Sequence, residues 1–297
     1  MAAPASSPPR RPAVGDLVRI VRPRQWTKNL LVLAAPVLSG QLTEPDTLRS
    51  AAVAFVVFSV TASGIYCVND AHDAPQDRLH PLKRLRPVAA GRMSPRTAHV
   101  FGAVLVLLGL LGGLAWGRPL FLVVATYAAI SLAYCFWLKS EPVIDIAVIA
   151  SGFLLRAIAG GAAAGIELSQ WFLLASSFGS LYMAAGKRYA EIRVADQPES
   201  FRPALARYTP DYLRFVWTLS AGVLIMTYGL WAFELKAQHD TVWPVISMAP
   251  FVLAVLRYAV DVDAGLAGEP EEIALRDRVL QGLAIAWTIC IVLAVYP

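Results

Sequence analysis

The sequence predicts an all-α membrane protein, a polytopic bundle of about nine transmembrane helices with a cytoplasmic N-terminus. Hydrophobic residues make up 57% of the 297 residues and charged residues only 16%, whereas an ordinary soluble domain is about 45–50% apolar. The apolar residues gather in segments of about 20 residues, the length that a bilayer core requires. Basic residues accumulate in particular connections between these segments, as in a membrane protein of fixed orientation.

Nine apolar segments can be traced along the chain. Pro36 interrupts the first segment, and only the short sequence GIEL separates the fifth from the sixth, so a count of eight stays open. The predicted spans are 27–43, 50–68, 98–116, 119–138, 142–164, 168–185, 212–235, 242–260 and 277–296.

Charge placement predicts the orientation, because Lys and Arg accumulate on the cytoplasmic side of membrane proteins. With the N-terminus inside, the cytoplasmic segments hold all but four of the 26 basic residues. The net charge of +5 therefore indicates topology and anionic substrates at one face, rather than binding to nucleic acid. The four exceptions are Arg49, Arg118, Arg156 and Lys236.

The chain is expected to form one domain behind a short tail. Residues 1–18, rich in Pro, Ala and Ser at their start, predict a disordered cytoplasmic tail, and residues 19–297 predict a single transmembrane catalytic domain. The two long polar connections, 69–97 and 186–211, are both expected on the cytoplasmic side. Loops elaborated on one face commonly carry the functional site, so we expect it there.

An acidic motif opens the first of these loops. Asn69, Asp70, Asp73 and Asp77 follow the second span, and the three carboxylates would share one face of a continuing helix. Clustered oxygen ligands without cysteine suit Mg²⁺, which binds through one or two carboxylates and substrate phosphates. A solvated acidic helix end is the alternative, and Pro75 predicts a kink or a helix end within the motif.

A group of basic residues comes directly after the acidic motif. Lys83, Arg84 and Arg86 lie within ten residues of Asp77. A metal-binding carboxylate group beside cations is what a diphosphate needs, because the metal bridges its oxygens and Lys and Arg neutralise the rest. The alternative is ordinary basic charge in a cytoplasmic loop.

The second loop begins with the sequence KRYAE, residues 187–191. Lys187 and Glu191 are one helical turn apart, and Arg188 lies on a neighbouring face. They predict either a second phosphate-binding group or a surface ion pair.

Charged residues within and before the spans are further candidates. Asp145 and Arg156, three turns apart, predict either a polar cavity inside the bundle or a structural pair. Near the N-terminus, Arg24 and Lys28 flank Trp26, which predicts an interfacial anchor or a group that holds a lipid phosphate.

Three motifs together resemble the UbiA superfamily of intramembrane prenyltransferases. They are NDxxDxxxD from residue 69, RPxxxG from residue 86 and LLRAIAGG from residue 154. The resemblance extends over nearly the whole chain from residue 22 onward, and it implies nine helices and a Mg²⁺-dependent transferase.

The sequence departs from the superfamily at its second motif. Members that ionise a prenyl diphosphate carry DxxxD after the sixth helix, where this chain has the basic sequence KRYAE. Here it resembles the branch called decaprenyl-phosphate phosphoribosyltransferase, in cell-wall arabinan (arabinogalactan) precursor synthesis. This resemblance implies 5-phosphoribosyl 1-diphosphate as donor, polyprenyl phosphate as acceptor, and a multi-pass protein of the bacterial inner membrane whose active site faces the cytoplasm.

The resemblance also implies roles for individual residues. The catalytic group is Asp73, Asp77, Lys187 and Arg188, and Mg²⁺ is held by Asn69, Asp70, Asp73 and Asp77. The donor is bound by Lys83, Arg84, Arg86, Lys139, Tyr189 and Glu191, and the lipid phosphate by Arg24, Gln25, Lys28 and Arg156. The lipid phosphate oxygen would attack the anomeric carbon and invert its configuration.

Three other functions are compatible with parts of the sequence. A prenyltransferase with an aromatic or glycerol-phosphate acceptor would share the fold, but it should have an acidic second motif. A transporter also places charges inside a helical bundle, and a membrane scaffold would leave the charged motifs without purpose. The sequence leaves the oligomeric state open, a homo-oligomer included, because protein interfaces and lipid-facing helices look alike.

Overall fold

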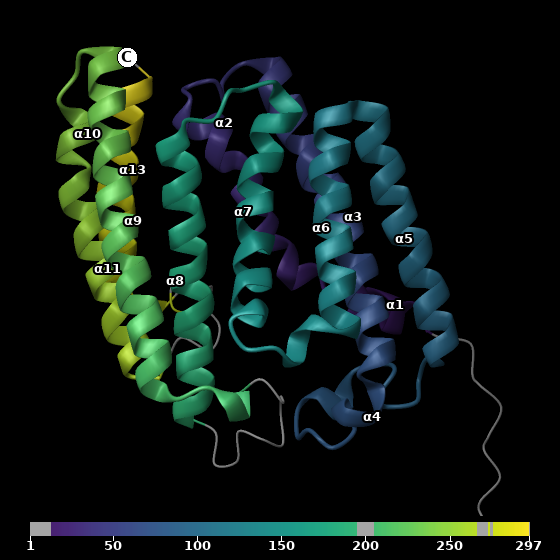
Figure 1. The fold of residues 1–297 in the computed structure, drawn as a ribbon. Coiled ribbons are helices and arrows are strands. Elements are labelled where there is room, and N and C mark those ends of the chain that lie inside the picture. Colours follow the sequence, from purple (N-terminus) through teal and green to yellow (C-terminus); the bar gives the residue numbers. More distant parts are fainter. Residues whose placement is uncertain (1–12, 195–204, 266–272, 274–275, 297) are drawn as a thin grey trace, which may run out of the picture. The chain divides into compact units, whose positions relative to one another are not determined.

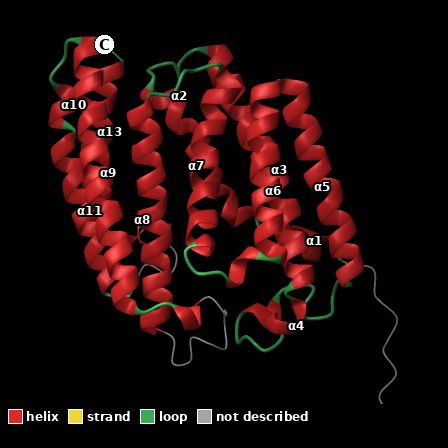
Figure 2. Cartoon of the chain, viewed as in Figure 1, coloured by secondary structure: helices red, strands yellow, loops and turns green. Residues whose placement is uncertain are grey.

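The computed structural model describes residues 13–194, 205–265, 273 and 276–296, and every regular element within them is helical (Figures 1 and 2). The all-α prediction is therefore confirmed. Long helices account for most of these residues, joined by short helices and turns. In chain order the elements are α1 (Val14–Val21), η1 (Pro23–Leu33), α2 (Ala34–Leu38), α3 (Pro45–His72), α4 (Ala74–Asp77), η2 (Lys83–Leu85), α5 (Pro95–Trp116), α6 (Arg118–Phe136), η3 (Leu138–Ser140), α7 (Ile144–Ala164), α8 (Gln170–Val194), η5 (Leu205–Arg207), α9 (Pro210–His239), α10 (Trp243–Ile246), α11 (Met248–Asp263) and α13 (Arg278–Val295).

Seven helical segments among the described residues are long and apolar enough to cross a membrane. They correspond to seven of the nine predicted spans. The predicted span 27–43 is instead divided between η1 and α2, neither of which is long enough. The span predicted at 168–185 lies in α8, whose 25 residues suffice in length but which is not among the seven. The seven segments are Pro45–His72, Pro95–Trp116, Arg118–Phe136, Ile144–Ala164, Pro210–His239, Trp243–Asp263 and Arg278–Val295.

Several helices begin where the sequence supplies a cap. Ser94 and Thr209 each precede a proline, and their side chains accept hydrogen bonds from the backbone N–H groups three residues on. Asp277 caps α13 in the same way through the N–H groups of Val279 and Leu280. The hydrogen bond from Arg257 and the bonds from these amides hold the pKa of Asp277 below its usual range.

Two boundaries differ from the sequence prediction. Residues 1–12 of the expected tail lie outside the described residues, but residues 14–18 belong to α1, where Asp16 forms an ion pair of 2.7 Å with Arg92. The polar connection expected from residue 186 starts later, because α8 continues to Val194. The KRYAE sequence therefore lies on a helix.

The chain divides into two compact units. Unit 1 comprises residues up to 30 together with 55–136, and unit 2 comprises 31–54 with the chain from 137 onward. In unit 1, α5 approaches the α3 backbone at glycines, since an added Cβ at Gly102 would lie 2.7 Å from the carbonyl oxygen of Gly64. In unit 2, α8 packs against α7 and α9, and α11 packs against α13.

A glycine fixes the closest backbone approach within unit 2. A Cβ on Gly160 of α7 would lie 1.8 Å from the carbonyl oxygen of Val32 and 3.2 Å from Pro36. Neither neighbour can move aside by a rotamer change, because the first is backbone and the second is a ring. Gly160 therefore allows α7 to contact the η1–α2 segment.

This contact predicts opposite outcomes for two glycine substitutions. We expect Gly160→Ala to lower the free energy of unfolding by about 1–3 kcal/mol, the usual cost of overpacking. Gly222→Ala, in α9, meets no atom within 4 Å and should be neutral or stabilising by up to about 1 kcal/mol. Thermal unfolding in detergent measures both, and equal effects would contradict the close contact at Gly160.

Candidate functional site

The acidic motif of unit 1 is held by two arginines. The Asp70 side chain at the end of α3 is only 1% exposed and forms ion pairs with both Arg22 and Arg86. Arg86 Nη1 lies 3.1 Å from Asp70 Oδ1 and 2.6 Å from Asp77 Oδ2, so one guanidinium bridges two carboxylates. Arg22 also lies over the Tyr66 ring, 5.0 Å from its centroid. The motif is thus a compensated charge cluster of unit 1.

The spacing of the aspartates suggested one continuous helix, whereas Pro75 predicted a kink or a helix end within the motif, and the structure confirms the break. Helix α3 ends at His72, and Asp73 is the N-cap of α4, which carries Pro75 in its first turn. Backbone hydrogen bonds from Asp73 to Asn69 and from Asp77 to Asp73 cross this break at 2.8 and 2.9 Å. The chain keeps a nearly helical path, which is why Asp70 and Asp77 still share Arg86.

The basic segment after the motif is folded back on itself. The His80 Nδ1 atom accepts the N–H groups of Leu82 and Lys83, at 3.2 and 3.3 Å. Arg92 donates to the carbonyl oxygen of Leu85 at 2.7 Å. Lys83 is half-buried and Arg84 is exposed, so this ordered turn presents Arg84 to its surroundings.

Two polar side chains anchor the segment that holds the predicted lipid-phosphate group. Trp26 donates to Ser63 at 3.0 Å and Asn29 to Ser59 at 2.9 Å, both on α3. Lys28, between these anchors, and Gln25, just before Trp26, are half-buried, and Arg24 is exposed. The pairing of Arg22 with Asp70 was missed, because nothing in the sequence links residues 48 positions apart.

A second charged cluster lies in unit 2 around Arg188. This side chain is 1% exposed, and its Nε lies 2.8 Å from Asp145 Oδ2 while its Nη1 lies 2.6 Å from Glu191 Oε2. Tyr208 donates its hydroxyl to the other Asp145 oxygen at 2.5 Å. Burial and this hydrogen bond raise the pKa of Tyr208, so the hydroxyl stays protonated as a donor.

The structure gives partners to three residues that the sequence had singled out. Asp145 pairs with Arg188 and not with Arg156, whose Nη1 donates to the Gly152 carbonyl oxygen at 2.5 Å. Tyr189 is fully buried and donates to Asp263 at 3.0 Å. Within KRYAE, then, Arg188 and Tyr189 point into unit 2.

The other charged residues of unit 2 that the sequence assigned to the donor site are more accessible. Lys187 is half-buried, the Glu191 side chain is 24% exposed, and Lys139 on η3 is half-buried. Tyr208 was not predicted from the sequence. A tyrosine in a polar segment carries no signal until its partner Asp145 is known.

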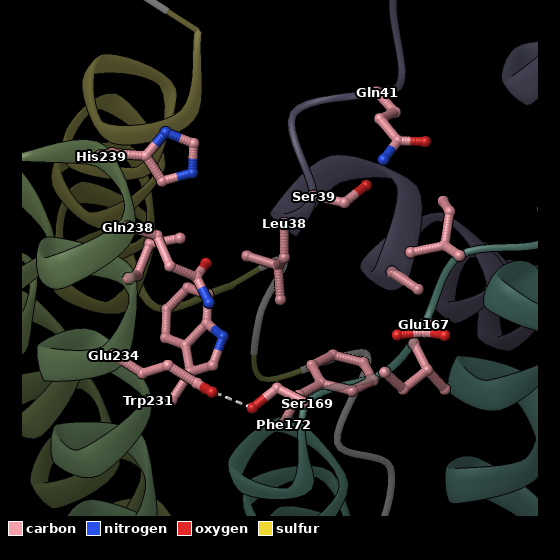
Figure 3. A pocket seen from close by; sticks show the side chains of 14 residues that line it. Leu38, Ser39, Gln41, Glu167, Ser169, Phe172, Trp231, Glu234, Gln238 and His239 are labelled. Carbon is pink, nitrogen blue, oxygen red and sulfur yellow. Dashed lines mark hydrogen bonds between the residues drawn. The ribbon is translucent and has the colours of Figure 1, made fainter.

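A cavity of about 470 Å³ opens at the other ends of α8 and α9 (Figure 3). Trp231 and Phe172 line it together with Glu167, Glu234 and His239, and Ser169 donates to Glu234. Its carboxylates would repel a phosphate. Along α8 the cavity residue Phe172 lies about 22 Å from Lys187, at about 1.5 Å per residue. Neither Arg156 nor KRYAE lines this cavity, which we therefore exclude as the phosphate site.

Comparison with known proteins identifies relatives over almost the full chain. The profile of the UbiA prenyltransferase family matches residues 30–272. The "Decaprenyl-phosphate phosphoribosyltransferase" of Mycolicibacterium smegmatis is 51% identical over 308 residues, covering 99% of this chain and 96% of that protein. The protein of the same name from Mycobacterium tuberculosis H37Rv is 52% identical over 279 residues, covering 92% of each.

Solved structures agree on the fold. A UbiA homolog from Archaeoglobus fulgidus, bound to GPP and Mg²⁺, superposes with a TM-score of 0.73 at 17% identity, covering 94% of this chain and 98% of that one. A structure described as digeranylgeranylglyceryl phosphate synthase gives a TM-score of 0.66 at 19% identity, covering 95% and 97%. At these identities the likeness establishes the fold alone.

The buried ion pair of Asp145 and an exposed ion pair of Glu141 should contribute differently to stability. We expect Asp145→Ala to destabilise the protein by about 3 kcal/mol, because it leaves Arg188 buried beside a single carboxylate. Glu141→Ala removes the partner of Arg207 from a pair whose side chains are 57% and 60% exposed, and should change stability by less than about 1 kcal/mol. Thermal unfolding of both variants in one detergent checks this, and a tolerated Asp145→Ala would contradict the buried pairing.

Proposed function

The chain belongs to the UbiA prenyltransferase family, and we propose that it transfers 5-phosphoribose from 5-phosphoribosyl 1-diphosphate to decaprenyl or another polyprenyl phosphate, releasing diphosphate. The observation that carries this proposal is the identity of about half of all residues, over nearly the full length, with proteins named decaprenyl-phosphate phosphoribosyltransferase. The basic KRYAE sequence supports it, since a donor with an additional phosphate needs cations there. The product would be a precursor of cell-wall arabinan.

The proposal includes nine transmembrane helices, a cytoplasmic N-terminus and an active site facing the cytoplasm, in the inner membrane of a bacterium. Helix α8 would be one of the two further spans, since its 25 residues reach about 37 Å at about 1.5 Å per residue. The basic residues of the segments around 78–96 and 187–214 support this orientation. Residues 19–297 would act as one catalytic domain, although they form two compact units.

The acidic motif of unit 1 fits a magnesium ion in the chemistry of its donors. Its ligands are oxygen atoms only, and the carboxylates of Asp70 and Asp77 already share one cationic group, Arg86. Within the described residues no three acidic, His or Cys side chains converge as a metal site. Mg²⁺ commonly binds proteins through one or two carboxylates and takes its other ligands from substrate phosphates and water. We assign Asp73 and Asp77, with Asn69 and Asp70, to hold Mg²⁺, which when bound would neutralise the leaving diphosphate.

The basic side chains of unit 1 would bind the diphosphate directly. Arg86 lies beside the motif, and a guanidinium that bridges two carboxylates can equally donate to phosphate oxygens. Lys83 and the exposed Arg84 would bind oxygens further out. Their positive charges would stabilise the negative charge that develops on the diphosphate as the C1–O bond breaks.

In unit 2 we propose that some residues contact the donor and that others hold those residues in place. Lys187 and Lys139, with Glu191, would bind the phosphoribosyl part of the donor. Arg188 and Tyr189, both fully buried, would support that group from inside rather than touch the donor.

The lipid phosphate would be bound by Arg24, Gln25 and Lys28, on the segment that Trp26 and Asn29 anchor to α3. We propose that the positive charge of Arg156, buried in α7, also stabilises the bound lipid phosphate. The attacking oxygen is already anionic, so no general base is needed. Attack opposite the diphosphate would invert the anomeric carbon.

The proposal predicts label transfer from radiolabelled 5-phosphoribosyl 1-diphosphate to polyprenyl phosphate by the detergent-purified protein. We expect transfer to require Mg²⁺, to stop on chelation, and to fall at least about 100-fold in Asp73→Ala, because an electrostatic group at the leaving diphosphate is lost. The lipid phase is extracted and counted.

Asp46→Ala provides the matched control, since this aspartate is an exposed residue in the first turn of α3. It should retain full activity. Prenyl transfer from a prenyl diphosphate to an aromatic acceptor, without any phosphoribosyl transfer, would refute the proposed donor and leave the family assignment intact.

A further inference from the structure

The carboxylate of Asp145 connects two segments that lie on either side of the connection between α8 and α9. Its Oδ2 atom is 2.8 Å from Arg188 Nε on α8, and its Oδ1 atom accepts the Tyr208 hydroxyl at 2.5 Å, two residues before α9 begins. Asp145 is itself 1% exposed. Each of its oxygens thus holds a different segment inside unit 2.

Tyr208 also holds a strained backbone position. The Val143 N–H donates to the Tyr208 hydroxyl oxygen at 2.5 Å, and Val143 has a φ of +70°. Positive φ is rare for a β-branched residue and costs about 1–3 kcal/mol, so it persists only where the surroundings impose it. The hydroxyl of Tyr208 bonds to both Val143 and Asp145, and it therefore fixes the turn that leads into α7.

Fixing Arg188 also fixes the direction of its neighbours on α8. At 3.6 residues per turn, Lys187 and Glu191 lie about 40° apart around the helix. Both lie on the same side of Arg188 around the helix, about 100° and 60° from it, and Glu191 is held further by its 2.6 Å bond to Arg188. The rotation of α8 about its axis thus decides where these two side chains point.

We propose that Asp145, Tyr208 and Arg188 form a buried clamp that positions Lys187 and Glu191 for the phosphoribosyl donor. This inference rests on the proposed function for its substrate. Tyr208 is a positioning residue in it and touches no substrate. Removing the Tyr208 hydroxyl should therefore impair donor binding, because α8 no longer holds Lys187 and Glu191 in place. Binding of the lipid phosphate should be unaffected.

Tyr208→Phe tests the clamp, and Tyr212→Phe is its matched control. The two rings stack with centroids 5.8 Å apart, but the Tyr212 hydroxyl makes no hydrogen bond within the described residues. We expect Tyr208→Phe to raise KM for 5-phosphoribosyl 1-diphosphate about tenfold, the effect of losing about 1.4 kcal/mol of ground-state binding. The KM for the lipid and kcat should change less than threefold, and Tyr212→Phe should match the wild type.

A second measurement does not depend on turnover. Hydrogen exchange of the backbone amides of residues 187–191 should be faster in Tyr208→Phe than in Tyr212→Phe, at equal melting temperature. Exchange that is the same in both variants would overturn the clamp, as would a Tyr208→Phe variant whose KM for the donor is unchanged. Absence of phosphoribosyl transfer by the wild type would instead refute the proposed function, and exchange would still decide whether Tyr208 holds α8.

Discussion

The ion pair between Asp145 and Arg188 is the interaction on which unit 2 depends most. Both side chains are 1% exposed, and a buried charge is tolerated only when a partner compensates for its lost hydration. The pair joins α7 to α8 beside a cluster of buried apolar residues that includes Ile146 and Ala185. Because Arg188 must face Asp145, α8 has one position along α7 and one rotation about its own axis. That rotation sets the direction of the other KRYAE side chains.

Unit 1 also contains a buried charged side chain that needs compensation, and here the buried charge is negative. There the buried group is the carboxylate of Asp70, and the arginines that compensate it, Arg22 and Arg86, are 24% and 25% exposed. Partly exposed guanidinium groups can contact a ligand without leaving their carboxylates, which a fully buried one cannot. This difference separates arginines suited to substrate from arginines suited to support.

Segment length and hydropathy were enough to predict seven membrane helices, because these properties are local. The first predicted span is not one long helix, since it is divided between the 3₁₀ helix η1 and the short helix α2, which contains Pro36. The acidic motif was equally evident from spacing, but its partner Arg22 was not, because it is distant in sequence from Asp70. For Asp145 the sequence suggested only Arg156 as a possible partner. The choice of Arg188 over Arg156 comes from the packing of α7 on α8, a tertiary property that periodicity does not contain.

The charge carried by α8 has a consequence for how the chain is made. It is the longest helix besides α3 and α9, yet it is not among the seven apolar enough to partition into lipid by composition. Its charged residues begin at Lys187, in the last third of the helix, so in the proposed topology they stay at the cytoplasmic surface, where basic residues are favoured. The ion pair between Arg188 and Asp145 joins α8 to α7, so it can form only once both helices are in place. The residues that organise the site would then also determine whether the newly made chain is retained or degraded.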